Sequence, residues 1–217
     1  MILHDMEQGS PEWFAARRGV PTASQFHRIL TPKTLKMSSQ ADGYMNELLA
    51  EWLIGETCDG SASSGWMERG NDLEPLAARW YAFEHDVDVQ TVGFATTDDG
   101  LIGGSPDRLV GEDGGLEIKC PAAKVHVAHL RGLDAFAKAH WLQIQGGMWV
   151  CERAWWDILS YNPVLPSAEL RVPADPKTID ALRESVTRFV QNMLEARDKL
   201  IKSGCEPVKA EIEHAMG

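Results

Sequence analysis

Two carboxylates and one amine stand close together near the middle of the chain. Asp107 precedes Glu117 by ten positions, and Lys119 follows Glu117 by two. Carboxylates held near each other repel unless one is protonated or a cation lies between them. A hard divalent ion such as Mg²⁺ is bound by a few carboxylates together with water and phosphate oxygens. A lysine beside such an ion can orient or deprotonate a water molecule, or balance charge on a phosphate in the transition state.

A hairpin predicted around residues 111–113, with the sequence GED, would bring these side chains together. Closed at that turn, the hairpin places Asp107 opposite Glu117 and Ser105 opposite Lys119. Residues directly opposed, and residues two apart on a strand, share a face of the sheet, so the four side chains converge. A slip of one residue in the register would scatter them.

A simpler alternative is an exposed hairpin with a surface salt bridge, and the spacing alone would favour it. The residues next to Glu117 and Lys119 argue against this alternative. Apolar residues alternate with Glu117 and Lys119, namely Leu116, Ile118 and Cys120. The alternation predicts a strand with one face on the core and a central place in its sheet. Charged side chains on a central strand need a reason to be there.

Periodicity and turn residues predict the elements around this strand. The stretch Ser10-Pro11-Glu12 is typical of a helix start, and Gly19 of its end. Further helices are predicted at residues 22–30, 41–54, 72–85, 125–132, 137–150 and 176–202. Strands are predicted at residues 87–97, 101–110, 115–120, 155–161 and 169–172. The order predicts an α/β fold, a central mixed sheet flanked by helices, with an N-terminal helical region.

The chain as a whole has the composition of one large folded domain. It has 217 residues, of which 44% are hydrophobic and 24% charged. We expect a single domain over 1–217, with a helical part at 1–57, a catalytic core at 66–202 and a loose tail at 203–217. The net charge of −11 argues against a simple nucleic-acid binder, although a basic groove can coexist with an acidic exterior. Four cysteines without metal-site spacing, and no leader or membrane-spanning apolar run, predict a reduced, cytoplasmic protein.

Four segments of the chain, in order, resemble one family. The residues S-P-D at 105–107, followed after nine residues by E-I-K-C-P, resemble the PD-(D/E)XK nuclease signature. More narrowly, they resemble the phage lambda exonuclease family, also called YqaJ-type viral recombinases, and so imply a restriction-endonuclease-like core. RRGVPTAS at 17–24, RGNDLE at 69–74 and HWLQIQGGMWV at 140–150 resemble this family's R-x-G-x-T-A-S segment, G-x3-E helix start and Q-x-Q helix. The likeness covers about residues 10–165.

The resemblance implies a role for each matched residue of the catalytic centre. Asp107, Glu117 and the main-chain carbonyl of Ile118 would hold the metal, and Lys119 would be the catalytic lysine. The implied cofactor is Mg²⁺, or Mn²⁺ in its place, with two ions per active site.

Two further residues are implied at the same centre. Glu74, in the first turn of a helix that also contains Pro75, would reach the metal directly or through water. From its own sequence context Glu74 is equally well a carboxylate that stabilises the helix dipole. Gln143 would position the attacking water or the phosphate, but the choice between Gln143 and Gln145 depends on the alignment alone.

A second group of residues matches the family positions that hold a 5′-terminal phosphate: Arg17, Ser24 and Ser105. An arginine fork with hydroxyl donors suits a terminal phosphate, and a helix N-terminus near Thr22 would add backbone donors. Without the family, Arg17 is equally a cation that complements the end of its own helix. Met67 matches the apolar wedge that enters between the strands at a duplex end, although a hydrophobic anchor for its loop is the alternative.

Other polar residues remain candidates for lesser roles. Arg108 stands where the family often has glycine, and strand alternation points it to the face opposite Asp107. His126 and His129 are spaced to share a metal, but no carboxylate stands near them in the sequence. The basic residues that we expect to line a DNA channel are Arg28, Lys33, Lys36 and Lys124.

The resemblance implies a Mg²⁺-dependent 5′→3′ exonuclease of a phage or prophage, which digests one strand of double-stranded DNA to mononucleotides. The product would be a 3′ single-strand overhang for recombination by strand annealing. The implied partners are double-stranded DNA with a 5′-phosphate end, two further copies in a ring-shaped homotrimer, and a single-strand annealing protein, with no membrane. Two alternatives stay open: a restriction-like endonuclease of the same superfold, and a non-catalytic DNA-binding scaffold.

Overall fold

The computed structural model describes the backbone of residues 1–58 and 65–208 and the side chains of residues 1–58 and 72–208. A five-stranded sheet lies at its centre, in the order β2-β5-β6-β7-β8. The strands are β2 (Val89–Gln90), β5 (Arg108–Val110), β6 (Gly114–Lys119), β7 (Trp155–Ser160) and β8 (Ala168–Pro173). The middle strand, β6, is antiparallel to β5 and parallel to β7. The predicted α/β fold with a central mixed sheet is confirmed.

The hairpin between β5 and β6 has the predicted register. Its ladder pairs Arg108 with Leu116, Leu109 with Gly115 and Val110 with Gly114. The ladder is shorter than predicted, because Ser105 and Asp107 precede β5 and Lys119 pairs instead with Ser160 of β7. Pro106 explains the early end, since proline has no N–H to continue a ladder.

A second sheet has three strands in the order β1-β3-β4. They are β1 (Ile2–His4), β3 (Phe94–Thr96) and β4 (Gly103–Gly104). The strands predicted at 87–97 and 101–110 are therefore each divided between the two sheets, and β1 has no counterpart in the sequence prediction. The first division falls at Gly93, where a Cβ atom would lie 2.1 Å from the carbonyl oxygen of Met6. The N-terminal segment crosses the chain there at a distance that only glycine permits.

Helices flank the sheets. Their bounds are α1 (Pro11–Arg17), α2 (Phe26–Ile29), α3 (Ala41–Ile54), α4 (Gly65–His85), α5 (Ala123–Arg131), α6 (Leu133–Ala139), α7 (Trp141–Val150) and α8 (Pro176–Lys202), with a 3₁₀ turn η1 at Ala23–Gln25. The helices α1, α3 and α8 begin where the sequence predicts. Two of these starts have a side-chain cap: Ser10 Oγ accepts the N–H of Trp13 at 3.2 Å, and Asp175 Oδ2 accepts that of Thr178 at 3.3 Å.

The predicted start of α4 is wrong. The helix begins at Gly65 and not near residue 72, so Pro75 lies inside it and Glu74 lies beyond its first turn. A proline inside a helix costs a hydrogen bond, but the ring of Pro75 is exposed and the following turns are fixed by packing on the sheet. The interpretation of Glu74 as a carboxylate at the helix N-terminus is therefore excluded.

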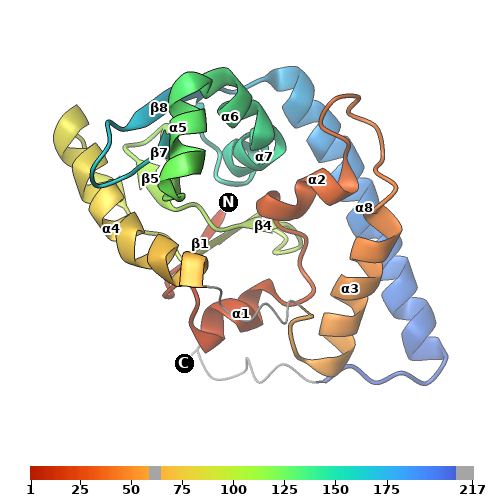
Figure 1. Ribbon diagram of the computed structural model, residues 1–217. Coiled ribbons are helices and arrows are strands. Elements are labelled where there is room, and N and C mark those ends of the chain that lie inside the picture. Colours follow the sequence, from red (N-terminus) through yellow and green to blue (C-terminus); the bar gives the residue numbers. More distant parts are fainter. Residues whose placement is uncertain (59–64, 209–217) are drawn as a thin grey trace.

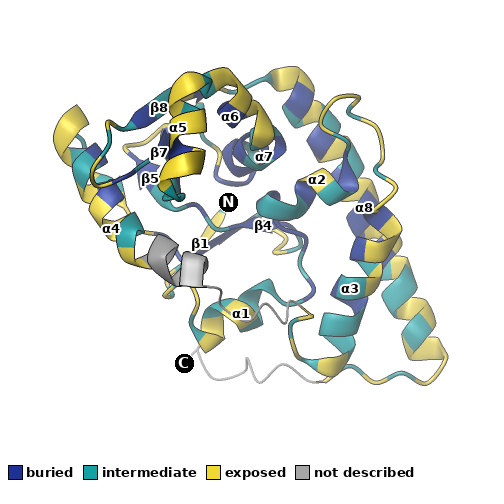
Figure 2. Ribbon diagram, in the orientation of Figure 1, coloured by how far each residue is buried: buried dark blue, intermediate teal, exposed yellow. Residues whose placement is uncertain are grey.

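The five-stranded sheet lies between two helical layers (Figure 1). On one face, residues of α4 pack on the sheet in a small core of Ala77, Ala78, Tyr81, Val110, Leu116, Ile118 and Leu159. The other face contributes to the larger core, together with residues of α2, α3, α7 and α8. Figure 2 shows α7 buried over most of its length, as expected for a helix between the sheet and α8.

Glycine residues bring α7 close to the sheet. The ring of Trp156 lies 2.2 Å from where a Cβ atom of Gly115 on β6 would be, and 3.1 Å from where one of Gly147 on α7 would be. Because neither glycine has a side chain, the indole fits between β6 and α7 while the strand and the helix stay close together. This close approach puts a polar side chain of α7, Gln143, within hydrogen-bonding distance of β6.

Candidate active site

The strands β5 and β6 separate where their ladder ends, and Asp107 fills the opening. The carbonyl of Pro106 accepts a hydrogen bond from Gln8 Nε2 at 2.9 Å. In its place, Asp107 Oδ2 accepts the main-chain N–H of Ile118 at 2.5 Å. The carboxylate thus acts as the acceptor that a continued ladder would have supplied, which holds it beside Glu117.

Two donors meet at one oxygen of Glu117. Lys119 Nζ and Gln143 Nε2 each lie 2.6 Å from Glu117 Oε1, and the glutamate is 4% exposed. A cavity of about 230 Å³ runs past these groups, and its polar lining comprises Gln8, Arg17, Ser24, Ser105, Asp107, Glu117, Lys119 and Gln143. The predicted convergence of the side chains at 105, 107, 117 and 119 is therefore confirmed.

The electrostatics of the site favour a bound cation. Burial raises the pKa of Asp107 well above its ordinary value, and the negative charges of Glu117 and Glu74 raise it further. Burial lowers the pKa of Lys119, but the charges of Glu117 and Asp107 and the hydrogen bond to Glu117 outweigh burial, so that the pKa is raised. Lys119 is thus an ammonium ion near neutral pH, and its single charge faces several carboxylates.

The donor set at this cavity fits a hard divalent ion. Among the side chains of residues 1–58 and 72–208, no group of three or more His, Cys, Asp and Glu could hold a metal ion by itself. Asp107 and Glu117 therefore offer two carboxylates, and an ion held by them would need further oxygen ligands. Mg²⁺ suits such a site, since it is usually held by one or two carboxylates and keeps water and substrate phosphate oxygens as its other ligands.

Glu74 is hydrogen-bonded to a guanidinium, whereas the family resemblance implies contact with a metal ion. Its Oε1 accepts a hydrogen bond from Arg108 Nη1 at 2.9 Å. The same nitrogen of Arg108 also donates to the main-chain carbonyl of Asp107. The side chain of Arg108 is 11% exposed and that of Glu74 31%, so the ion pair is partly buried. Glu74 lies near enough to the site for its charge to act on Asp107, but its hydrogen bond is with the guanidinium.

The two glutamines of α7 have different hydrogen-bond partners. Gln143 faces Glu117, and it also hydrogen-bonds with His140. Gln145 is fully buried, donates to Pro173 O at 3.0 Å and accepts the N–H of Asp175 at 2.8 Å. Gln145 therefore supports the start of α8, and Gln143 is the glutamine at the cavity.

A chain of hydrogen bonds links Arg17 to three hydroxyl groups, and Arg17, Ser24 and Ser105 line the same cavity. Arg17 Nη1 donates to Ser105 Oγ at 3.0 Å, and Arg17 Nη2 to Thr22 Oγ1 at 3.5 Å. The hydroxyls of Thr22 and Ser24 lie 3.3 Å apart. The structure thus brings together the three residues expected at a terminal phosphate, Arg17, Ser24 and Ser105, and adds Thr22.

The expected contribution of a helix N-terminus here is small. The predicted helix over 22–30 is divided into the three-residue η1 and the four-residue α2. Such short elements have little dipole, so side chains supply the positive charge of this region.

Trp13 is a site residue that the sequence prediction missed. Its indole Nε1 donates to Ser105 Oγ at 2.9 Å and to Gly93 O at 3.0 Å. The guanidinium of Arg17 lies 4.2 Å from the centre of its ring. The spacing of Trp13 and Arg17, four residues apart on α1, could have indicated this contact, since residues at that spacing share a helix face.

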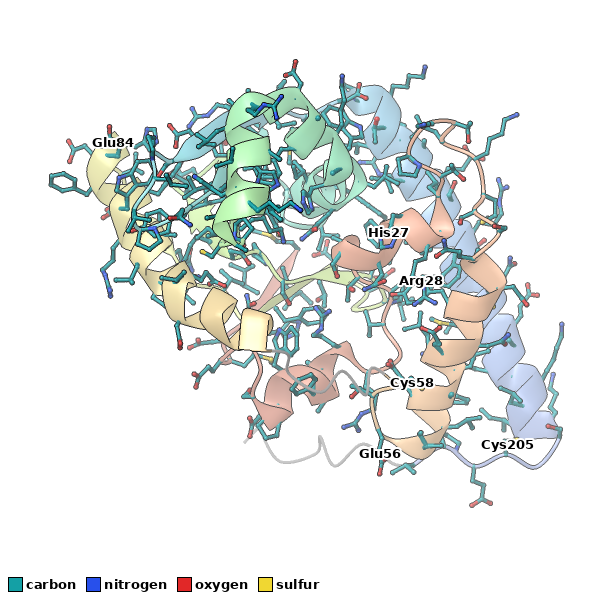
Figure 3. All side chains as sticks on the ribbon, viewed as in Figure 1. His27, Arg28, Glu56, Cys58, Glu84 and Cys205 are labelled. Carbon is teal, nitrogen blue, oxygen red and sulfur yellow. The ribbon has the colours of Figure 1, made fainter. Side chains whose placement is uncertain are left out.

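A larger cavity, of about 800 Å³, adjoins the first and shares Gln8, Trp13 and Arg17 with it. Its charged lining residues are Glu7, Arg17, Arg28, Glu47, Glu51, Glu74 and Arg108. Of the expected channel residues, only Arg28 lines it, since Lys33, Lys36 and Lys124 are exposed elsewhere. Arg28 points from α2 toward α3 (Figure 3), where both of its terminal nitrogens lie 2.6 Å from the carboxylate of Glu47.

The histidine pair of α5 does not form a metal site. His126 Nδ1 and His129 Nδ1 each lie 2.8 Å from the same hydroxyl, Ser160 Oγ. His126 Nε2 donates to Pro166 O at 2.9 Å. The ring nitrogens of His126 are therefore both used by neutral partners, and the hypothesis of a metal shared with His129 has no structural support.

The proposed wedge residue, Met67, lies outside the described side chains. Its backbone belongs to α4, whose side chains are described from Asp72 onward. In the described part of the chain, no helix has both the length and the apolar character required to cross a bilayer.

Comparison with known proteins identifies the family. The model of the YqaJ-like viral recombinase domain matches residues 12–154, well over half of the chain. The chain belongs to this family. The matched range contains both groups of residues described above. They are Asp107, Glu117, Lys119 and Gln143, and Trp13, Arg17, Thr22, Ser24 and Ser105.

Solved structures support the same assignment. An alkaline exonuclease from Laribacter hongkongensis has a TM-score of 0.78 and 30% identity, over 89% of this chain and 97% of that one. The same enzyme in complex with dAMP has a TM-score of 0.78 and 31% identity, over the same shares of the two chains. A phage-related exonuclease from Haemophilus somnus shares the fold, with a TM-score of 0.64 and 18% identity over 85% of this chain and 96% of that one. No curated protein matches the chain.

Family and structural neighbours together support a nuclease function for this protein. DNA is the substrate class that membership of a recombinase and exonuclease family implies. Divalent metal ions are the cofactors that nucleases of this family generally use, in agreement with the two-carboxylate site.

Proposed function

We propose that the protein is a Mg²⁺-dependent 5′→3′ exonuclease that degrades one strand of double-stranded DNA. The observation that carries this proposal is the junction of two clusters in one cavity. Asp107, Glu117, Lys119 and Gln143 line it together with Arg17, Ser24 and Ser105. A metal-dependent hydrolytic centre next to a phosphate-binding cluster suits a strand held by its terminal phosphate while the adjoining bond is cleaved.

In this proposal the carboxylates of Asp107 and Glu117 and the carbonyl of Ile118 hold the ion. When bound there, a divalent ion supplies Lewis-acid activation of the attacking water and of the scissile phosphate. Lys119, charged because its pKa is raised, stabilises the negative charge that grows on the phosphate. Gln143 holds Glu117 in place through its 2.6 Å hydrogen bond and presents its amide to the attacking water or the phosphate.

The group formed by Arg17, Ser24 and Ser105 gives the enzyme its preference for DNA ends that carry a 5′-phosphate. A terminal phosphate monoester carries more negative charge than an internal diester, and it can accept several charge-assisted hydrogen bonds. Trp13 holds Arg17 and Ser105 in place, the first through its ring and the second through its indole N–H. A 5′-hydroxyl end lacks the charge that this cluster recognises, so it binds weakly.

The products are mononucleotides and a 3′ single-strand overhang. The structure of the Laribacter hongkongensis enzyme with dAMP supports this, since dAMP is the kind of product that such cleavage releases. By the family resemblance, we further propose a homotrimeric ring around DNA and a single-strand annealing protein as partner. A ring would reconcile the net charge of −11 with DNA binding, because only its inner surface has to attract phosphate.

One assay tests the function. The purified full-length protein is incubated with linear duplex DNA that has 5′-phosphate or 5′-hydroxyl ends, and with a covalently closed circle, in the presence of Mg²⁺ or EDTA. Asp107→Ala serves as the inactive control. The proposal predicts mononucleotides from the linear duplex, faster with 5′-phosphate ends, and no product from the circle or in EDTA.

Other outcomes would replace this proposal with one of its alternatives. Cleavage of the closed circle would identify an endonuclease, since a circle has no end to enter. DNA binding by both parent and Asp107→Ala, without Mg²⁺-dependent cleavage by either, would identify a scaffold.

A further inference from the structure

We infer that Arg108 takes the place of a second divalent ion in this protein, so that the active site binds one metal ion tightly. The inference rests on the proposed function and deepens it. The family resemblance implies two ions per site, with Glu74 reaching one of them. Here, Glu74 is occupied by the guanidinium of Arg108 at 2.9 Å.

The position of Arg108 is set by strand alternation and by α4. Arg108 and Val110 share a face of β5, and Val110 lies in the core under α4. Arg108 therefore projects toward α4 and meets Glu74 there. A glycine at this position, frequent in the family, would leave Glu74 without this cation.

The guanidinium is fixed at the edge of the catalytic cluster. One nitrogen, Arg108 Nη1, donates both to Glu74 and to the main-chain carbonyl of Asp107, the residue that begins the metal site. The side chain is 11% exposed, so water screens its charge only in part. A divalent cation at either oxygen of Glu74 would have to displace Arg108 or lie beside a like charge.

The formal charges lead to the same conclusion. The carboxylates of Asp107, Glu117 and Glu74 face the two cations Lys119 and Arg108, which leaves one negative charge. A single Mg²⁺ reverses that sign, and the DNA phosphate then restores balance. Before DNA binds, a second Mg²⁺ would enter a cluster that is already positive, which makes its binding weak.

The test is the number of Mn²⁺ ions bound by the full-length protein, measured by calorimetric titration and by electron paramagnetic resonance of free Mn²⁺. Asp107→Asn provides the baseline for weak binding to an acidic surface. The parent is expected to bind one ion above that baseline. Arg108→Gln keeps a polar side chain with an N–H donor but removes the charge, and it is expected to bind a second ion about tenfold or more tightly than the parent does.

Two further variants separate charge from structure. Arg108→Lys keeps the charge and should bind one ion, as the parent does. The double variant with Arg108→Gln and Glu74→Gln removes the second carboxylate and should return to one ion. Thermal melting of each variant in EDTA checks that it is folded.

Each outcome decides the inference. Two tight ions in the parent, one ion in both parent and Arg108→Gln, or two ions in Arg108→Lys would overturn it. A parent that binds no ion above the Asp107→Asn baseline would instead contradict the metal site of the proposed function. The parent titration alone remains decisive if a variant does not fold.

Discussion

Gln143 of α7 donates a hydrogen bond of 2.6 Å to Glu117 at the centre of the sheet. The contact joins the helical layer to the strand that holds this proposed metal ligand, and it exists because Gly115 and Gly147 accommodate the ring of Trp156 between them. The packing of Trp156 between β6 and α7 therefore sets the distance between Gln143 and Glu117.

Replacing Gln143 by alanine should lower kcat by about 10²-fold, because Glu117 loses a charge-assisted hydrogen bond and the substrate loses an oriented amide. The melting temperature should change little. Gln145→Ala is the matched control on the same helix. It should lower the melting temperature, since the carbonyl of Pro173 and the N–H of Asp175 lose their hydrogen-bond partner, and it should spare kcat of the folded fraction. The reverse pattern, with kcat lost through Gln145, would contradict the assignment.

Lys119→Ala should reduce cleavage by about 10³-fold or more while the protein stays folded, since the ammonium that faces the phosphate is lost. Single-turnover rates on saturating linear duplex measure this effect without the binding step. Lys124→Ala, which removes an exposed lysine of α5, is the control and should cleave at the parental rate. Substantial turnover by the Lys119 variant would remove the lysine from the mechanism.

Arg17→Ala should abolish the preference for 5′-phosphate ends, because its guanidinium holds the hydroxyl of Ser105 and is the charge nearest the proposed phosphate site. The quantity to measure is the ratio of initial rates on duplexes with 5′-phosphate and 5′-hydroxyl ends. That ratio should fall to about one, a change that corresponds to a lost charged hydrogen bond. Arg28→Ala, in the larger cavity, should slow both substrates equally. An equal loss on both substrates for Arg17→Ala would argue against a role in end recognition.

The metal-free protein should lose stability as the pH rises. Burial and the charges of Glu117 and Glu74 raise the pKa of Asp107 in the folded state. The folded state therefore binds this proton more tightly than the unfolded state does. The stabilisation from this difference is complete below the pKa of the unfolded state and is lost as the pH rises through the folded pKa.

Melting temperatures in EDTA across that pH range provide the check. Asp107→Asn should show a flatter profile and should be more stable than the parent at the upper end. Addition of Mg²⁺ should stabilise the parent there and leave the variant unchanged. Parallel profiles for parent and variant would mean that Asp107 is not held near other charges.

Gly115→Ala should destabilise the protein by about 1–3 kcal/mol, because the new methyl group would lie 2.2 Å from the buried ring of Trp156. Gly43→Ala, inside α3, has no atom within 4 Å of its new methyl group and should stabilise the protein by about 0.5–1 kcal/mol. Urea denaturation measures both. If Gly115→Ala left the free energy of unfolding unchanged, the fold would not depend on the close approach of β6 and α7.

The hairpin of β5 and β6 could be predicted from the sequence because its determinants are local. The turn at 111–113 and the alternation of Leu116 and Ile118 with charged residues set both the register and the buried face. The ladder ends at Pro106, which has no N–H, and the carbonyl of Pro106 accepts a hydrogen bond from a distant residue, Gln8. Sequence spacing contains no sign of that contact.

The contacts that sequence reasoning missed join segments far apart in the chain. The pair of Glu74 and Arg108 spans 34 positions, and the hydrogen bond of Trp13 with Ser105 spans 92. The start of α4 was misjudged because Pro75 favours a helix start locally, whereas packing on the sheet allows the helix to run through it. Local rules fail where tertiary packing decides the outcome.

The most direct measurement is a crystal structure of the protein soaked with Mn²⁺, with anomalous scattering used to locate the ion. We expect a peak between Asp107 and Glu117, about 2.1 Å from an oxygen of each, the distance at which a hard divalent ion is held. A peak elsewhere, with these two carboxylates binding no ion, would contradict it.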